Sequence, residues 1–272
     1  MTSSDQRPVE PPPGAAARQL DGGESDLLIR EEPLVIEAGG QRVVTMRTPG
    51  DDANLATGFL LSEGVITSPD AIAGIEFEAG DPSELRADTL KVDVDPKNAV
   101  IEGKLSRTHE IRSSCGICGL ADPDELLEEL PPLLPGTPSL TTAGIEQVRA
   151  SFVSNQRLFD RTGACHGAEI FGPDGATWGR GEDVGRHNAL DKAIGAAACA
   201  GHELAHGTAM LSGRAGFDLV LKCLRVRIPA ILSVSAASAL SFDLCSAAGA
   251  TLAGFVRPGR LKVYCGHGRI SD

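Results

Sequence analysis

The last quarter of the sequence alternates short apolar runs with longer helical stretches, and this alternation constrains the fold more than any other feature. Residues 208–211, 230–234 and 252–256 predict strands, whereas 216–226 and 237–248 predict helices. Strand, helix, strand, helix and strand with short connections are typical of a parallel sheet with right-handed crossovers. The sequence therefore predicts an α/β fold for this part of the chain.

The residues that follow these strands are rich in serine, glycine and arginine. In an open parallel sheet, ligands bind beyond the carboxyl ends of the strands. The residues expected at that edge are Ser212-Gly213-Arg214, Ser235 with Ser238, and Arg257-Pro258-Gly259-Arg260. Two helix N-termini with free N–H groups meet there, which favours a phosphate or pyrophosphate ligand. Capping alone would explain the serines, but it does not explain three arginines at one edge.

The charge distribution agrees with an anion site near the C-terminus. The chain of 272 residues has 25 Lys and Arg against 37 Asp and Glu, a net charge of −12. Residues 201–272, however, contain eight Lys and Arg against four acids, a net charge of +4. We expect no nucleic-acid partner, since phosphate neutralisation needs a generally basic surface.

Other features exclude further classes of protein. No apolar run reaches the roughly 20 residues that cross a bilayer, and the N-terminus lacks a basic-then-apolar signal pattern. We therefore expect a cytoplasmic protein without a membrane partner. The seven cysteines, an odd number in a chain of this length, favour reduced thiols over a disulfide framework.

The sequence divides into four segments by composition. Residues 1–25 are rich in Pro, Gly, Ser and Ala and predict a disordered tail. Residues 26–130 predict an α+β subdomain, and 131–140 form a Pro-rich connector. Residues 141–272 form the α/β domain. The further elements that we expect are strands at 34–36, 42–47, 72–77, 90–94, 169–171, 176–179 and 261–264, and helices at 52–63, 124–130, 145–155 and 187–200.

A Cys-x-x-Cys motif, Cys115-Gly-Ile-Cys118, stands on a Gly-rich and Ser-rich loop. Two thiols at this spacing suit half of a zinc site, a redox pair or a sulfur relay. A structural zinc site needs four closed ligands, and the remaining cysteines offer no second Cys-x-x-Cys. We therefore expect no structural metal.

Two histidines lie in glycine-bounded loops, His166 after Thr162-Gly163-Ala-Cys165 and His187 within Glu182-Asp183-Val-Gly-Arg186-His187-Asn188. Histidine titrates near neutrality, so both are candidates for moving protons. The alternative for the second string is a helix cap made by Asp183 or Asn188, with Arg186 paired to Glu182.

Several strings, in this order, resemble the FdhD family of formate dehydrogenase accessory sulfurtransferases. They are Cys115-Gly-Ile-Cys118-Gly, Thr162-Gly163 with His166, Glu182-Asp183-Val-Gly-Arg-His-Asn-Ala-Leu-Asp-Lys192, Leu211-Ser-Gly-Arg214 and Gly254-Phe-Val-Arg257. The resemblance runs from about residue 27 to the C-terminus. It implies a cytidine-deaminase-like α/β core with a mixed, mostly parallel sheet, and a homodimer.

The resemblance also implies a function. Sulfur from a cysteine desulfurase is carried as a persulfide on Cys115, with Cys118 as its motif partner. It passes to the molybdenum of Mo-bis-molybdopterin guanine dinucleotide before that cofactor enters formate dehydrogenase. The family's cofactor-binding stretch falls on Phe255, Val256, Arg257, Pro258, Gly259 and Arg260. To this stretch we add Ser212, Gly213, Arg214 and Ser235, because the predicted fold brings them to the same edge. We also add His166 and His187, whose glycine-bounded loops suggest the wall of a site.

Two alternatives belong to other classes. A zinc-dependent deaminase would need His-x-Glu upstream of Pro-Cys-x-x-Cys, but here Ser114 precedes Cys115. A non-catalytic chaperone for the molybdenum cofactor would bind and deliver its cargo without a reactive Cys115.

Overall fold

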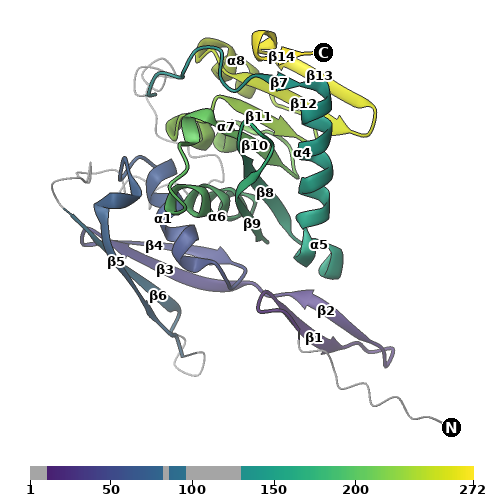
Figure 1. Ribbon diagram of the computed structural model, residues 1–272. Coiled ribbons are helices and arrows are strands. Elements are labelled where there is room, and N and C mark those ends of the chain that lie inside the picture. Colours follow the sequence, from purple (N-terminus) through teal and green to yellow (C-terminus); the bar gives the residue numbers. More distant parts are fainter. Residues whose placement is uncertain (1–10, 82–85, 96–129) are drawn as a thin grey trace.

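The computed structural model describes residues 11–81, 86–95 and 130–272, and it has a six-stranded sheet at its centre (Figure 1). The strand order is β13-β12-β11-β10-β8-β9. The strands are β8 (His166–Phe171), β9 (Thr177–Asp183), β10 (Thr208–Leu211), β11 (Ala230–Ser233), β12 (Thr251–Arg257) and β13 (Arg260–Cys265). The strands predicted from 208 onward are thus confirmed.

The central sheet is mixed, as expected, but its pairing is not mostly parallel. Strands β10, β11 and β12 pair in parallel, whereas β8 with β9, β8 with β10, and β12 with β13 are antiparallel. The reason is that β8–β9 and β12–β13 are hairpins, and a short turn can only join antiparallel neighbours.

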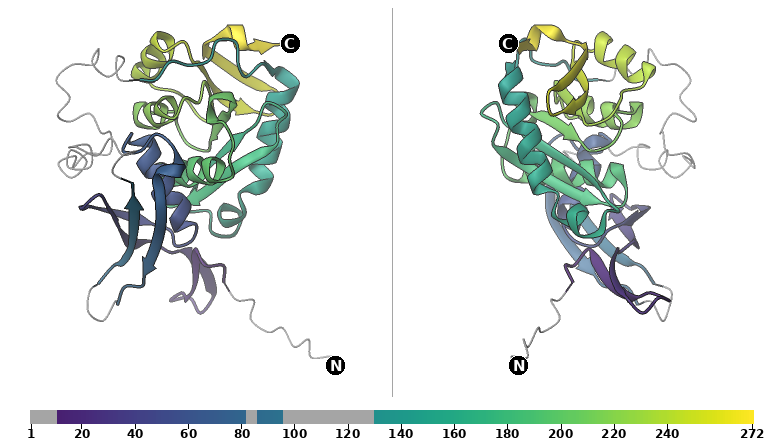
Figure 2. Two further views of the ribbon diagram at one scale, coloured as in Figure 1. Left: turned by 60° about the vertical axis from the view of Figure 1, so that its left-hand side comes forward. Right: turned by 90° about the vertical axis from the view of Figure 1, so that its right-hand side faces the viewer.

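Helices cover both faces of this sheet, and the views in Figure 2 show α4 on one side and α7 and α8 on the other. The helices of this part are α4 (Thr142–Asn155), α5 (Arg157–Thr162), α6 (Arg186–Cys199), α7 (Phe217–Arg225), α8 (Ala239–Ala247) and the 3₁₀ turns Leu204–His206 and His267–Arg269. Successive strand residues point to opposite faces. Ile231 therefore joins the core beneath α6 and α7, while Leu232 joins the core beneath α4.

The N-terminal part is a second sheet of four strands with order β4-β3-β6-β5. Its elements are β3 (Glu32–Ala38), β4 (Gln41–Arg47), α1 (Asp52–Ser62), a 3₁₀ turn (Pro69–Ala71), β5 (Ile72–Glu78) and β6 (Asp88–Val94). The predicted turn at Gly39-Gly40 is confirmed, and both glycines have positive φ, as a tight hairpin requires. Pairing is antiparallel except between β3 and β6.

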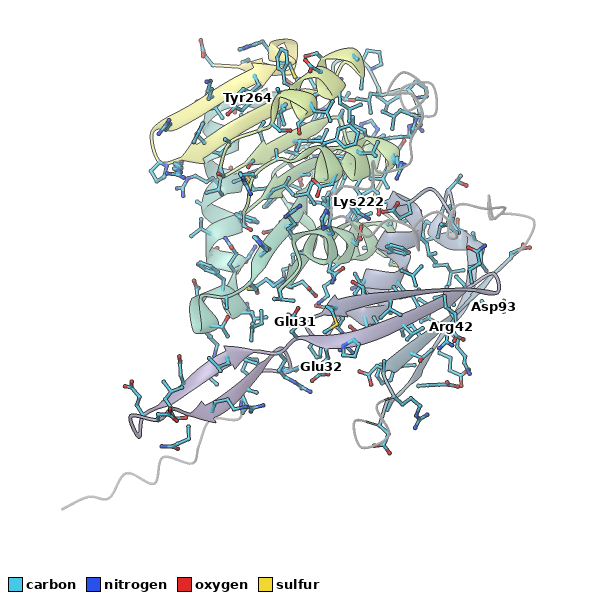
Figure 3. The ribbon with its side chains drawn as sticks, turned by 180° about the vertical axis from the view of Figure 1, so that it is seen from behind. Glu31, Glu32, Arg42, Asp93, Lys222 and Tyr264 are labelled. Atoms are coloured by element: carbon cyan, nitrogen blue, oxygen red, sulfur yellow. The ribbon has the colours of Figure 1, made fainter. Side chains whose placement is uncertain are left out.

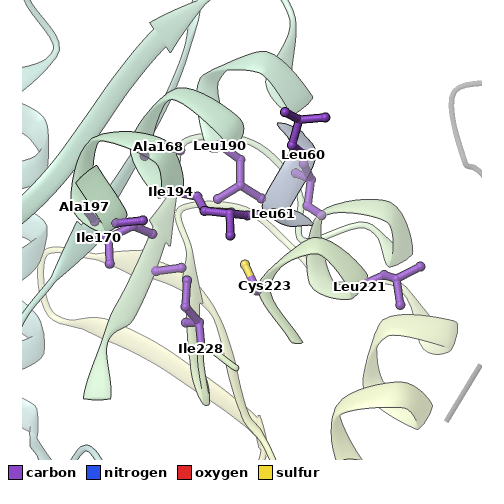
Figure 4. Close-up of a cluster of buried hydrophobic side chains, with 14 of the residues drawn as sticks. Leu60, Leu61, Ala168, Ile170, Leu190, Ile194, Ala197, Leu221, Cys223 and Ile228 are labelled. Carbon is purple, nitrogen blue, oxygen red and sulfur yellow. The ribbon is translucent and has the colours of Figure 1, made fainter. Parts of the chain in front are cut away.

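The two parts share one hydrophobic core, in which α1 lies directly against α6. A Cβ atom on Gly58 of α1 would lie 1.8 Å from the carbonyl oxygen of Asp191, and one on Gly195 of α6 would lie 1.9 Å from that of Asn54. Glycine at both positions therefore lets the two backbones approach. Figure 4 shows the core that results, to which Leu60 of α1 and Leu190 and Ile194 of α6 belong.

The expected disordered tail over 1–25 is wrong in part. Residues Ala15–Gln19 form β1, which pairs antiparallel with β2 (Ser25–Ile29). Small side chains do not prevent a backbone ladder, and Gly23, with a φ of 85°, closes the turn. Figure 3 shows Glu31 and Glu32 where this hairpin joins β3. Residues 1–10 lie outside the described part of the chain.

The structure contains elements that the sequence analysis did not predict, and one predicted helix falls almost wholly outside the described residues. Helix α5 and the short parallel pair β7 (Leu140–Thr141) with β14 (Ile270–Ser271) were missed. The helix expected at 124–130 falls almost wholly outside the described residues. None of the helices that the structure describes is long and apolar enough to cross a membrane.

Candidate functional site

Loops from distant parts of the sequence meet at one edge of the central sheet. Strands β9, β10, β11 and β12 end at this edge, and helices α6, α7 and α8 begin there. Strand β8 runs antiparallel to β9 and starts at the same edge, since its first residue, His166, pairs with Asp183, the last residue of β9. We call this edge the strand-end edge; its residues are His166, Arg186, His187, Ser212, Gly213, Arg214, Asp218, Ser235 and 255–260. The sequence prediction that the three strand-end loops share an edge is confirmed.

The loop after β10 is fixed by its serine. Ser212 Oγ accepts a hydrogen bond from the Gly167 N–H (2.9 Å), and the Ser212 N–H donates to the Gly167 carbonyl (3.0 Å). Gly213 comes next, and a Cβ on it would lie 3.6 Å from Nδ1 of His166. The sequence neighbours Ser212 and Gly213 are therefore adjacent to His166, while Arg214 is exposed to solvent.

His166 is half-buried and surrounded by positive charge. Burial lowers the pKa of His166, and the charges of Arg186 and His187 lower it further. A histidine whose pKa lies below its usual range is neutral at pH 7. The ring can therefore accept a proton.

His187 and Arg186, at the start of α6, share one carboxylate. Arg186 Nη2 donates to Asp218 Oδ2 (2.9 Å), and His187 Nε2 is hydrogen-bonded to the same oxygen. Burial alone would raise the pKa of Asp218, but the hydrogen bonds from His187 and Arg186 hold it well below its usual range. The sequence alternative that Arg186 pairs with Glu182 is wrong, because Glu182 instead accepts the N–H groups of Leu158 and Phe159.

The β12–β13 hairpin carries the stretch expected to bind the cofactor. Phe255 has a φ of 52°, and its N–H donates to the Ser235 carbonyl (2.9 Å), so the two predicted loops are in contact. The Arg260 guanidinium lies over the Phe255 ring at 4.5 Å. Arg257 Nε donates to the Val234 carbonyl (3.2 Å), and residues 257–260 are exposed.

Comparisons with known proteins agree with the resemblance read from the motifs. The profile of the FdhD/NarQ family matches residues 29–271. The chain belongs to this family. A protein named sulfur carrier protein FdhD from Anaeromyxobacter dehalogenans strain 2CP-C is 40% identical, over 99% of this chain and 98% of that protein. One of the same name from Streptomyces avermitilis is 39% identical, over 90% of this chain and 89% of that protein.

A solved structure is also similar to this chain. It is a putative formate dehydrogenase accessory protein from Desulfotalea psychrophila, with a TM-score of 0.71 and 26% identity. The match covers 94% of this chain and 97% of that one.

In this FdhD-family chain, a buried network behind the strand-end edge was missed by the sequence interpretation. Lys192 Nζ lies 2.8 Å from Asp183 Oδ2 and donates to the Thr48 carbonyl (2.8 Å). Asp183 Oδ2 in turn accepts the Thr48 N–H (3.0 Å). Asn188 Nδ2 donates to the Met46 carbonyl (2.7 Å). These contacts fix the 183–188 loop to the N-terminal part of the chain.

The cysteines divide between described and undescribed residues. Cys115 and Cys118 lie outside the described part of the chain. Cys165 is buried, and its Sγ donates to Glu182 Oε1 (3.5 Å). Burial and the Glu182 charge raise the pKa of Cys165 to about 12, so its thiol is protonated at neutral pH. No group of three or more metal-binding side chains occurs in the part of the chain that is described.

Proposed function

We propose that this protein is a sulfur carrier for formate dehydrogenase. It takes persulfide sulfur from a cysteine desulfurase onto Cys115 and transfers that sulfur to the molybdenum of Mo-bis-molybdopterin guanine dinucleotide. The observation that carries the proposal is the strand-end edge, where His166, Arg214 and the 255–260 hairpin come together in a member of the FdhD/NarQ family. The proposal includes the cytidine-deaminase-like core, the homodimer and the cytoplasmic location.

The strand-end edge fits a nucleotide cargo in three respects. The exposed guanidinium groups of Arg214, Arg257 and Arg260 are available to phosphate oxygens, and guanidinium matches phosphate with paired hydrogen bonds. The N-termini of α6 and α7 add free N–H groups and positive dipole ends. The Phe255 ring with Arg260 over it offers a flat surface of the kind on which a guanine base stacks. Ser212, Gly213 and Ser235 line the loops between them.

Sulfur enters on Cys115 by thiol exchange. The Cys115 thiolate attacks the outer sulfur of the donor persulfide; the donor S–S bond breaks, a new S–S bond forms on Cys115, and the donor leaves as a thiolate. Releasing that sulfur as sulfide takes two electrons. Attack of the Cys118 thiolate on the inner sulfur supplies them, because it forms a Cys115–Cys118 disulfide and expels HS⁻. A thiol reductant then restores the pair.

His166 and His187 would manage the protons of this transfer. His166 is neutral and lies beside Gly213, so it can accept a proton from an incoming thiol or hydrosulfide group. His187 is held by Asp218 through Nε2, and its Nδ1 makes no hydrogen bond within the described residues, so it is the ring nitrogen that would meet the cargo.

Mass spectrometry of the intact protein tests the sulfur step. After incubation with a cysteine desulfurase and cysteine, the wild-type protein should gain about 32 Da, one sulfur atom, and the Cys115→Ala variant should not. Cys165→Ala is the matched control, and it should gain the same mass as the wild type. A wild-type protein that never gains sulfur would overturn the proposal. A Cys115→Ala variant that still activates formate dehydrogenase would instead establish a non-catalytic chaperone.

Binding of GDP, as a surrogate for the cargo, tests the edge. Arg257→Ala or Arg214→Ala should weaken GDP binding by about 10-fold, since each removes one charge-assisted contact. Unchanged affinity in both variants would show that the nucleotide binds elsewhere.

A further inference from the structure

A cavity of about 1100 Å³ lies at the opposite end of the helix layer from the strand-end edge. It is formed where α1, α6 and α7 end, and its lining includes Leu61, Ile66, His202, Leu204, Arg225 and Arg227. Helix α6 has 14 residues, which at about 1.5 Å each separate its two ends by about 20 Å. This helix-end cavity is therefore distinct from the proposed cargo site. Its volume is just above the range of about 300–1,000 Å³ that is typical of small-molecule sites.

Arg227 holds a backbone conformation that arginine rarely adopts. It follows α7 with a φ of 66°. Its N–H donates to the Leu224 carbonyl (2.9 Å), and the next N–H, of Ile228, donates to the Cys223 carbonyl (2.9 Å). This double closure normally has glycine at the position of Arg227, because a side chain there is strained. The presence of an arginine at this strained position points to a functional role for its side chain.

The Arg227 side chain has no partner among the described residues. Its Nε is buried and makes no hydrogen bond. Neighbouring Arg225, by contrast, donates to Glu63 Oε2 (3.2 Å) and to the Ser62 carbonyl (3.4 Å). An arginine that only offset the negative end of the α7 dipole would donate to the last carbonyls of that helix. A buried donor without an acceptor is unfavourable, and an anionic ligand would relieve it.

The rest of the wall suits the body of a small organic anion. The His202 ring lies in the wall and stacks on Trp178, with centroids 4.7 Å apart and planes within 2°. Leu61, Ile66 and Leu204 supply apolar surface. The two acids of the wall, Asp70 and Glu203, are exposed to solvent, which screens their charge. Asp70 accepts from Ser68 Oγ, and Glu203 Oε2 lies 3.5 Å from His206 Nε2.

We infer that the helix-end cavity binds a small organic anion, with Arg227 on its carboxylate or phosphate group and His202 beside its apolar body. The site is a second ligand site, independent of the cargo at the strand-end edge.

The only tryptophan of the chain, Trp178, reports on occupation because it stacks on His202. The experiment titrates the full-length protein with phenyl phosphate, with benzoate, and with benzamide as the uncharged counterpart of benzoate, while Trp178 fluorescence is followed. Phenyl phosphate or benzoate should give a saturable change, and benzamide should bind about 10- to 100-fold more weakly. The tighter of the two anions identifies the acidic group that the site prefers.

The Arg227→Gly variant separates binding from folding. Glycine relieves the positive φ, so the melting temperature should equal or exceed that of the wild type, while anion affinity falls about 10- to 100-fold. Arg180→Ala, which removes an exposed arginine on β9, is the matched control and should bind as the wild type does. Absence of a saturable signal from either anion below about 10 mM, or unchanged affinity in Arg227→Gly, would overturn the inference. GDP binding is measured in parallel and should be equal in Arg227→Gly and wild type, so failure here is separate from failure of the proposed function.

Discussion

The two ends of the helix layer handle positive charge differently. At the strand-end edge, Asp218 holds Arg186 and His187, and the exposed arginines stand outside this cluster. At the helix-end cavity, Arg225 is paired with Glu63, whereas Arg227 has no partner among the residues that the structure describes. Helix dipoles favour an anion at the first end and oppose it at the second. The edge can therefore share a ligand's charge among many groups, whereas the cavity depends on a single side chain.

A buried network of ion pairs lies between the two ends of the helix layer. Its disruption should lower the free energy of unfolding more than substitutions at Gly195, Asp218 or His166. Lys222 of α7 donates to Ser62 Oγ (2.9 Å), and its Nζ lies 2.7 Å from Glu63 Oε1 and 3.0 Å from Asp191 Oδ2. Figure 3 labels Lys222 in the interior of the molecule. We expect Lys222→Met to lower the free energy of unfolding by about 3–5 kcal/mol, because it leaves the buried Asp191 carboxylate without its cation, whereas Glu63 keeps Arg225. Urea denaturation measures this.

The control for this prediction is the exposed Lys262, whose ammonium lies over the Tyr264 ring. Lys262→Met should change the stability by about 0.5 kcal/mol. Because the network joins α1, α6 and α7, Lys222→Met should weaken ligand binding at both ends. An effect on one end alone would contradict this link.

A smaller effect is expected from Gly195→Ala. The added methyl group would meet the Asn54 carbonyl at 1.9 Å, so α1 and α6 must separate. Overpacking of this kind lowers stability by about 1–3 kcal/mol. In thermal unfolding, Gly22→Ala is the control, since no atom lies within 4 Å of the position of its new Cβ. A Gly195→Ala protein as stable as the wild type would show that the helices can move apart freely.

Asp218→Asn distinguishes the strand-end edge from the cavity. The substitution removes the carboxylate that Arg186 and His187 share. We therefore expect the free energy of unfolding to fall by about 1–3 kcal/mol at pH 7. The pKa of Asp218 is lowered in the folded state. Its contribution is therefore complete above the unfolded pKa of about 4 and is lost as the pH falls below it. In denaturation measurements from pH 7 to pH 3, the difference in stability between the two proteins should shrink below about pH 4 and still be present at pH 3, because its full loss requires the pH to fall through the lowered folded-state pKa. Binding in the cavity should stay unchanged.

The smallest change in stability is expected from His166. The pKa of His166 is lower in the folded protein than in the unfolded chain, where it is about 6.5. Below about pH 6.5 the unfolded chain therefore binds a proton on this histidine more readily than the folded protein does. Stability should fall as the pH drops through this window, and His166→Asn should reduce that slope. Chemical denaturation at pH 7.5 and pH 5.5 measures the difference. An equal slope in both proteins would mean that burial and the charges of Arg186 and His187 do not lower the pKa of His166.

The sequence predicted those features that depend on local pattern. The loops at Ser212-Gly213-Arg214 and Arg257–Arg260 were assigned to one edge because strand and helix periodicity alone determines where parallel strands end. The Gly39-Gly40 hairpin followed from turn chemistry in the same way.

Features that depend on distant partners could not be predicted. Asp218 begins a helix, but its role comes from His187, 31 residues earlier. Lys192 is buried by Thr48, 144 residues away, and nothing in its own neighbourhood signals that partner. The conformation of Arg227 could not be predicted either, because a positive φ at an arginine has no local signature in the sequence. The hairpin of β1 was missed because a backbone ladder can form from residues that bury little apolar surface.

The close contact of Gly58 with α6 has a consequence for biosynthesis. Gly58 and Gly195 are more than 130 residues apart in the sequence, yet each faces backbone of the other's helix. During translation at roughly 5–20 residues per second, α1 leaves the ribosome many seconds before the helix that must cover it. The N-terminal sheet therefore has to wait with its apolar face open. A chaperone that binds nascent chains would find its target in this interval, before the last third of the protein has been made.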